Sequence, residues 1–297
     1  NGVLIVQSTP QGGRISGTSS IFNLDGWNWE DAVLKMDDAI HINWPSVYNR
    51  KWENGTITYK ENKEFENQVN ELVAFFKNAE AYTKSDFILE TNLRFEAMRP
   101  VFTGDKKVFI HANNAKELSS AIYFIREQKV KSPVLVGAYD ALLVADLLVD
   151  YKIPVVLRRV HELPLREDDA VDLPYQLPAL LAEKGVKFCL QNDGSMQAMG
   201  TRNLPFYAGT AAAHGLDREE ALKSISLHAA QILGIDQQVG SLEPGKRATL
   251  FVSEGDALDM RTNQLSAAFV SGKMIDLGSH QRDLYERYMK KYGLEPN

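Results

Sequence analysis

Short apolar segments alternate with amphipathic segments through the second half of the chain. From residue 106 the order is strand-like KKVFIHA, helix-like AKELSSAIYFIREQK, strand-like SPVLVGA, helix-like DALLVADLLVDYK and strand-like IPVVLRRV. An irregular stretch follows, then the helix-like YQLPALLAEKG, the strand-like VKFCLQN, and helices near 203–215 and 217–233. The strands are almost continuously apolar, which is typical of strands covered on both faces. This alternation predicts βαβ units and a parallel sheet.

The two ends of the chain follow different patterns. Residues 3–7 (VLIVQ) predict a strand, and the Gly- and Ser-rich STPQGGRISGTSS after it predicts a long loop. Residues 61–100 have the apolar spacing of one helical face. Near the C-terminus, strand-like segments follow one another without helices, and a charged helix should end near Gly293. We therefore predict a partial barrel domain (1–238), C-terminal β-sandwich strands (239–276) and a helical tail (277–297).

Composition and charge exclude some classes of protein. The chain has 297 residues, of which 44% are hydrophobic and 24% charged, so it is expected to be globular. With a formal net charge of -6 and no run of Lys and Arg, we expect no nucleic-acid partner. No segment reaches the roughly 18 apolar residues of a membrane span, so no membrane partner is expected. The lone Cys189 excludes an intrachain disulfide and leaves the compartment, cytoplasmic or periplasmic, open.

The segment from Pro205 to Lys273 carries a family resemblance. LPFYAGTAAAHGLDREEALKSISLHAAQILGIDQQVGSLEPGKRATLFV resembles the C-terminal region of imidazolonepropionase-like members of the amidohydrolase superfamily. Upstream, VFIHANN, SPVLVGAYDA, IPVVLRR and VKFCLQNDGS fit that family's fifth to eighth barrel strands. The resemblance implies an α/β fold, a (β/α)8 TIM-barrel-like metal-dependent hydrolase with a small C-terminal β element. Because the chain opens at Asn1, we expect the barrel to be incomplete at a truncated or processed N-terminus.

The resemblance also implies an activity and a cofactor. Such proteins hydrolyse non-peptide carbon–nitrogen bonds in small molecules, such as a cyclic amide or a small peptide-like substrate, with a metal-activated water. The implied cofactor is a divalent metal, zinc first. The implied partner is a small-molecule substrate. An incomplete barrel also predicts a homo-oligomer or a complementing N-terminal segment, because it exposes sheet edges.

Two residues match the family's metal-site pattern. His111 ends VFIHA, where the strand-five ligand belongs, and Asp193 ends VKFCLQND, where the strand-eight ligand and catalytic proton shuttle belongs. Imidazole and carboxylate are good zinc ligands. The residues alone leave other roles open: His111 as a hydrogen-bonded polar residue at a strand end, and Asp193 as a turn or cap residue. After strand seven, His161 and Arg158 are candidate substrate-binding residues, or else part of a solvated charged loop.

Other positions depart from the pattern. Gly137 stands where strand six should carry a histidine, and no H-x-H pair occurs in the chain. His41 lies too late for strand one and is interpreted as an ordinary surface or strand residue. Fewer than the three protein ligands of a usual catalytic zinc then remain. The sequence therefore leaves an alternative, a catalytically inactive amidohydrolase-like protein with a degenerate metal site that binds or assembles.

Overall fold

A curled seven-stranded sheet organises the structure, a computed structural model that describes residues 2–53, 55–192 and 197–294. Its strand order is β1-β2-β3-β6-β7-β8-β9, and β4 and β5 form a separate hairpin. The strands are β1 (Ile5–Ser8), β2 (Ile15–Asn23), β3 (Val33–Asn43), β4 (Tyr48–Glu53), β5 (Thr56–Glu61), β6 (Lys107–Ala112), β7 (Pro133–Gly137), β8 (Val155–Leu157) and β9 (Phe188–Leu190).

The sheet has a parallel half and an antiparallel half. β3, β6, β7, β8 and β9 are parallel neighbours, which confirms the sheet predicted from the repeating pattern. β1, β2 and β3 pair antiparallel. The prediction of a loop through residue 20 was wrong, because Ile15–Asn23 is a strand whose pairing with β3 is interrupted by irregularities. The result is half of a TIM-like barrel.

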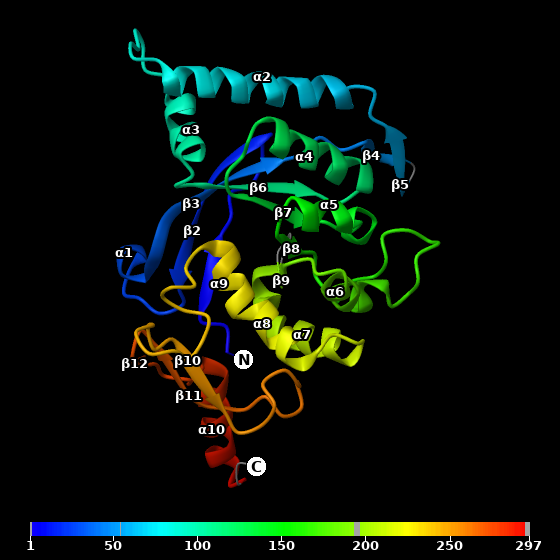
Figure 1. The fold of residues 1–297 in the computed structure, drawn as a ribbon. Helices are drawn as coiled ribbons and strands as arrows, with labels where there is room; N and C mark the ends of the chain where they lie inside the picture. The colour runs from blue at the N-terminus through cyan, green and yellow to red at the C-terminus, as the bar shows by residue number, and fades with distance from the viewer. Residues whose placement is uncertain (1, 54, 193–196, 295–297) are drawn as a thin grey trace.

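Helices cover the outer face of the curl, and α9 lies inside it (Figure 1). The outer core joins Ile40 and Ile110 to α2 and α4 through Phe76 and Ile122. On the inner face, Ile232 of α9 packs with Phe109 and its neighbours. The helices are α1 (Trp29–Ala32), α2 (Phe65–Lys84), α3 (Leu93–Thr103), α4 (Ala115–Glu127), α5 (Ala145–Asp150), α6 (Leu173–Glu183), α7 (Leu204–Ala213), α8 (Arg218–Ile225), α9 (Leu227–Leu233) and α10 (His280–Tyr292), with 3-10 turns at Ala141–Val144 and Gln197–Asn203.

Strand alternation decides which side chains face the inside of the curl. In β6, Val108 and Ile110 point into the outer core, while Phe109 points inward. In β3, Ile40 and Ile42 likewise face the helices. Ala39 belongs to the inner cluster with Phe109. Odd-numbered positions near the ends of β3 and β6 therefore line the inner face.

Glu117 fixes the start of α4 against the segment that follows β3. One carboxylate oxygen accepts from the backbone N–H groups of Asn113 and Asn114, at 3.2 Å each, and completes a capping box at the helix N-terminus. The other accepts from the backbone N–H of Val47 and the hydroxyl of Ser46, both at 2.9 Å. A nearly buried carboxylate thus ties two of the loops at the carboxyl edge of the sheet together.

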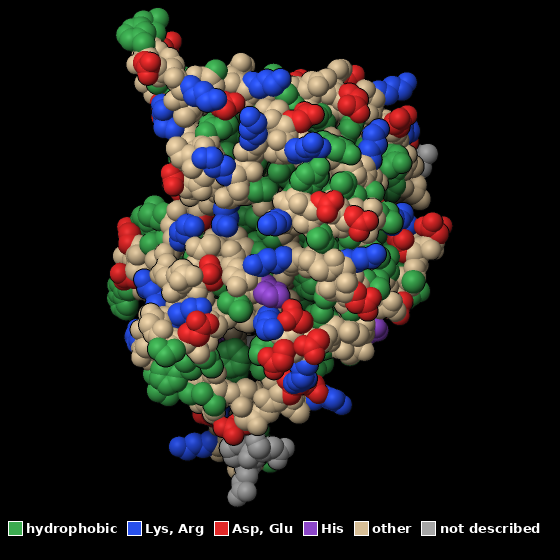
Figure 2. Space-filling view, viewed as in Figure 1, with side chains coloured by type: hydrophobic (Ala, Val, Ile, Leu, Met, Phe, Trp, Pro, Cys, Tyr) green, Lys and Arg blue, Asp and Glu red, His purple; other side chains and the backbone are tan. Residues whose placement is uncertain are grey.

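The C-terminal part is a small sheet followed by a helix. β10 (Leu250–Ser253), β11 (Leu265–Val270) and β12 (Lys273–Met274) pair antiparallel. α10 begins after the N-cap Ser279 and ends at Gly293, which has a positive φ, as predicted. The division at 238 and 276 stays a prediction. Acidic and basic side chains are interspersed over the face in Figure 2. No helix in the described ranges has the length and apolar composition to cross a membrane.

Candidate functional site at the carboxyl ends of the strands

His111 lies near the end of β6 on the inner face of the sheet. It is in register with Asn43 of β3 and Val136 of β7. The carboxyl ends of parallel strands converge at one edge of a barrel, where barrel enzymes place their reacting groups. The backbone carbonyl of His111 also accepts from the N–H of Trp44 at 3.0 Å, so the ends of β3 and β6 are joined directly.

His41 of β3 lies against His111. The Nδ1 atom of His41 is 2.9 Å from the Nε2 atom of His111, and the ring centroids are 5.2 Å apart. His41 is only 1% exposed and also contacts the ring of Phe109. The interpretation of His41 as an ordinary surface or strand residue therefore missed its place in the site. It is a strand residue, but it is buried beside the predicted ligand.

The environment of His41 keeps its ring neutral. Burial, together with the neighbouring His111, lowers the pKa of His41 to about 3. Its Nε2 atom is buried and has no hydrogen-bond partner within the described residues. Neutral imidazole is the form that binds transition metals. Imidazole nitrogens are suitable ligands for a divalent metal, so this pair, 2.9 Å apart, has the chemistry of two of the three protein ligands that a catalytic zinc usually takes.

The described residues do not provide further metal ligands beside this pair of histidines. Within residues 2–53, 55–192 and 197–294, no three or more His, Cys, Asp or Glu form a group that could hold a metal ion. Asp193, the predicted strand-eight ligand, lies outside the described residues. The residue before it in the sequence, Asn192, accepts a 2.8 Å hydrogen bond through its side-chain oxygen from the hydroxyl of Tyr207 in α7.

β7 ends at Gly137, a residue without a side chain, at the position where the family pattern has a histidine. Gly137 has φ +90°, in the left-handed region. A Cβ atom there would lie 2.6 Å from the Oδ1 atom of Asn113 and 3.3 Å from the carbonyl oxygen of Ala112. The carbonyl of Ala112 accepts from the N–H of Ala138 at 2.7 Å in the same turn. The turn itself therefore requires glycine, and a histidine at 137 needs a different backbone.

The two predicted substrate-binding residues are held by specific partners. The Nε2 atom of His161 is 2.6 Å from the hydroxyl of Thr210, and its ring packs edge-on against Tyr207, 4.6 Å between centroids. Burial lowers the pKa of His161. Arg158 donates to both carboxylate oxygens of Glu162, with its Nη2 atom 2.6 Å from Oε1. The side chains of His161 and Arg158 thus lie against α7 and Glu162; their roles stay predictions.

Comparisons with known proteins agree with the fold and the C-terminal pattern. The sequence model of the Amidohydrolase family matches residues 171–275. A 74-residue segment is 39% identical to imidazolonepropionase from Erwinia tasmaniensis, covering 25% of this chain and 16% of that protein's length. The crystal structure of an amidohydrolase from Thermotoga maritima superposes with a TM-score of 0.76 at 22% identity, covering 93% of this chain and 72% of that one.

The family match and the fold point to the same class of protein. Residues 171–275 match the Amidohydrolase family, and the half-barrel with its small C-terminal sheet has the fold of the Thermotoga maritima amidohydrolase. These similarities support a relation to the amidohydrolase superfamily, and the chain spans only a small part of the imidazolonepropionase that it matches.

Proposed function

We propose that this protein hydrolyses carbon–nitrogen bonds other than peptide bonds in a small molecule, such as a cyclic amide or a small peptide-like substrate. The observation that carries the proposal is the His41–His111 pair at the carboxyl edge of the sheet, with two imidazole nitrogens 2.9 Å apart. The family match supports the same reaction class. The matched relative is covered over only 16% of its length, so the activity rests on this site and not on the relative's name.

In this proposal His111 and Asp193 would hold a divalent metal, zinc first, and His41 is a third candidate ligand. When bound, the metal supplies water activation and polarisation of the scissile carbonyl. His41 remains neutral because it is buried, and so it presents a lone pair at any physiological pH. Asp193 is the proposed proton shuttle, taking a proton from the attacking water and passing it to the leaving nitrogen. Asn192, which precedes Asp193 in the sequence, accepts a hydrogen bond from the hydroxyl of Tyr207 through its side-chain oxygen.

Substrate contacts are assigned to the segment after β8. Arg158 is held rigidly by Glu162, so it offers its remaining N–H groups to a substrate carbonyl in a fixed direction. His161 is held against α7 by Thr210 and Tyr207, and we assign its imidazole a polar contact with the substrate. Both residues follow β8, which pairs in parallel with β9.

Metal content measured by plasma mass spectrometry, on protein purified without chelator, tests the proposal. We expect close to one equivalent in wild type, a loss in His111→Ala and in Asp193→Ala, and a reduced content in His41→Ala. His280→Ala, which removes an exposed imidazole from α10, is the matched control and should retain the metal. Loaded protein is then assayed against lactams, cyclic imides and N-acyl amino acids.

A second function, a binding or assembly role without catalysis, is favoured by one observation. The turn at Gly137 leaves no room for a side chain at the strand-six ligand position. In that case wild-type protein and His111→Ala contain equal, background amounts of metal, and no substrate of the panel is hydrolysed. That result would remove the hydrolase proposal.

A further inference from the structure

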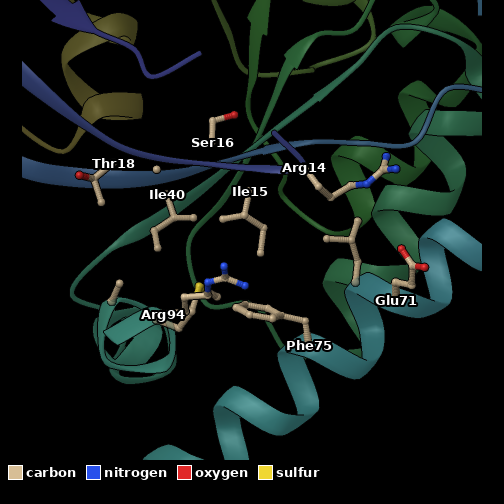
Figure 3. A pocket seen from close by; sticks show the side chains of 12 residues that line it. Arg14, Ile15, Ser16, Thr18, Ile40, Glu71, Phe75 and Arg94 are labelled. Carbon is tan, nitrogen blue, oxygen red and sulfur yellow. The ribbon is translucent and has the colours of Figure 1, made fainter. Parts of the chain in front are cut away.

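A cavity of about 480 Å³ lies on the opposite face of the sheet from the imidazole pair. It lies between β2 and β3 on one side and α2 and α3 on the other and is open to solvent (Figure 3). Ile40 lines it, whereas His41, the next residue of β3, contacts the inner-face Phe109. Because successive strand residues point to opposite faces, this cavity is separate from the candidate metal site.

The walls of the cavity are mainly apolar. Strand residues contribute from one side and helix residues from the other, namely Ile15, Ile40, Leu72, Phe75 and Met98. A volume of this size is within the range of small-molecule sites, and apolar walls with a few polar groups are typical of them. The walls therefore suit a hydrocarbon or aromatic body of modest size.

Two arginines at this cavity lack a counter-charge. The guanidinium groups of Arg14 and Arg94 make no ion pair or hydrogen bond with any residue that the structure describes. Figure 3 shows the guanidinium of Arg94 directed into the space between Ile40 and Phe75, whereas Arg14 and Glu71 lie toward the other end. Glu71 makes no ion pair either, within the same described ranges. The lining thus carries two positive charges and one negative charge.

We propose that this cavity binds an amphipathic monocarboxylate, with its carboxylate on Arg94 and its apolar body against Ile15, Ile40 and Phe75. A guanidinium is well suited to a carboxylate because it offers parallel N–H donors. Glu71 offsets the charge of Arg14 at the far end, so the net positive charge of the lining lies at Arg94, which suits a ligand with a single carboxylate. Nothing in the hydrolase proposal uses this cavity, and the two stand independently.

Titration calorimetry of the 297-residue chain with decanoate as the probe tests the proposal. We expect one decanoate per chain, and weaker binding of decan-1-ol, which has the same chain length without the charge. Arg94→Gln should weaken decanoate binding at least about tenfold, the order expected for a lost charge-assisted hydrogen bond. Arg287→Gln, an equal charge change on exposed α10, is the matched control and should leave it unchanged.

Two further variants separate charge from shape. Glu71→Gln should leave decanoate binding equal or tighter, because it removes a like charge. Ala97→Trp, on the exposed side of α3 where it lines the cavity, should abolish binding by filling the space, with the circular dichroism spectrum and thermal midpoint retained.

Several results would overturn the proposal. It fails if decanoate does not bind, if decan-1-ol binds as tightly, or if Arg94→Gln and Arg287→Gln behave alike. It also fails if light scattering shows a dimer that Ala97→Trp dissociates, because a second copy of the chain then occupies the groove. None of these results bears on metal content at His111, so the two proposals can fail separately.

Discussion

The structure predicts that glycine is required at position 137, the last residue of β7, and this can be tested by substitution. Replacing it by alanine has two separable costs. The first is conformational, because φ is +90° and an L-residue in the left-handed region costs about 1–2 kcal/mol. The second is steric, because the new Cβ meets the Oδ1 atom of Asn113 at 2.6 Å, and overpacking of this kind costs about 1–3 kcal/mol. We therefore expect Gly137→Ala to lower the free energy of unfolding by about 2–5 kcal/mol.

Two comparisons separate these costs. Gly185 has φ +77° with no atom within 4 Å of a built Cβ, so Gly185→Ala should show the conformational cost alone, about 1–2 kcal/mol. Asn113→Ala removes the clashing oxygen, which is buried without a hydrogen-bond partner in the described part of the chain. In the double variant the steric cost should disappear, giving a coupling energy of about 1–3 kcal/mol between positions 113 and 137.

Urea unfolding followed by circular dichroism measures all four variants, with the midpoint shift converted through a shared m-value. The reasoning is refuted if Gly137→Ala unfolds at the wild-type midpoint, or if it costs no more than Gly185→Ala. An unchanged cost in the double variant would show that Asn113 is not the obstacle. If the reasoning holds, a histidine at 137 cannot be installed by substitution alone.

Three further predictions concern buried polar groups. Burial raises the pKa of Asp38, so protonation of this carboxyl stabilises the folded state. This contribution is complete below about pH 3.9 and is lost as the pH rises through the raised native pKa. The urea midpoint of Asp38→Asn should therefore lack the decrease with rising pH that wild type shows, whereas the exposed control Asp150→Asn should keep it. Tyr207→Phe removes the donor to Asn192 and should cost about 1 kcal/mol in the same assay, and no change would mean that the bond is not formed in solution. Glu117→Gln weakens charge-assisted hydrogen bonds and should lower the free energy of unfolding by about 1.5–3 kcal/mol; a thermal midpoint equal to that of wild type would contradict it.

Much of the parallel half could be predicted from local pattern. The apolar run around VFIHA and the following amphipathic segment place β6 and α4 correctly, because burial on both faces imposes an apolar strand and one-sided burial imposes helical spacing. The end of α10 at Gly293 is local in the same sense. The position of His111 at a strand end follows from these patterns and from the chain order of the resemblance.

The antiparallel half of the sheet was harder to predict from the sequence. β2 contains Gly17, Ser19 and Ser20, and such residues favour turns unless strands on both sides supply hydrogen-bond partners and packing. Several polar residues of this half find partners on another strand: the hydroxyl of Ser19 donates to Asp38 at 2.7 Å, and the amide of Gln7 donates to Asp38 at 2.8 Å. No local periodicity encodes a pairing between residues 31 positions apart.

In the candidate site, too, some features could be predicted from local sequence and others depend on contacts between distant segments. Imidazole at 111 and glycine at 137 are properties of the chain, and their position at strand ends could be read from it. That His41 is buried beside His111 was decided by the parallel pairing of β3 with β6, which joins residues 70 positions apart. That Gly137 excludes a side chain was decided by the approach of Asn113. Local hydrophobic pattern selects the elements, but contacts between distant segments depend on register and packing, which exist only once the sheet has assembled.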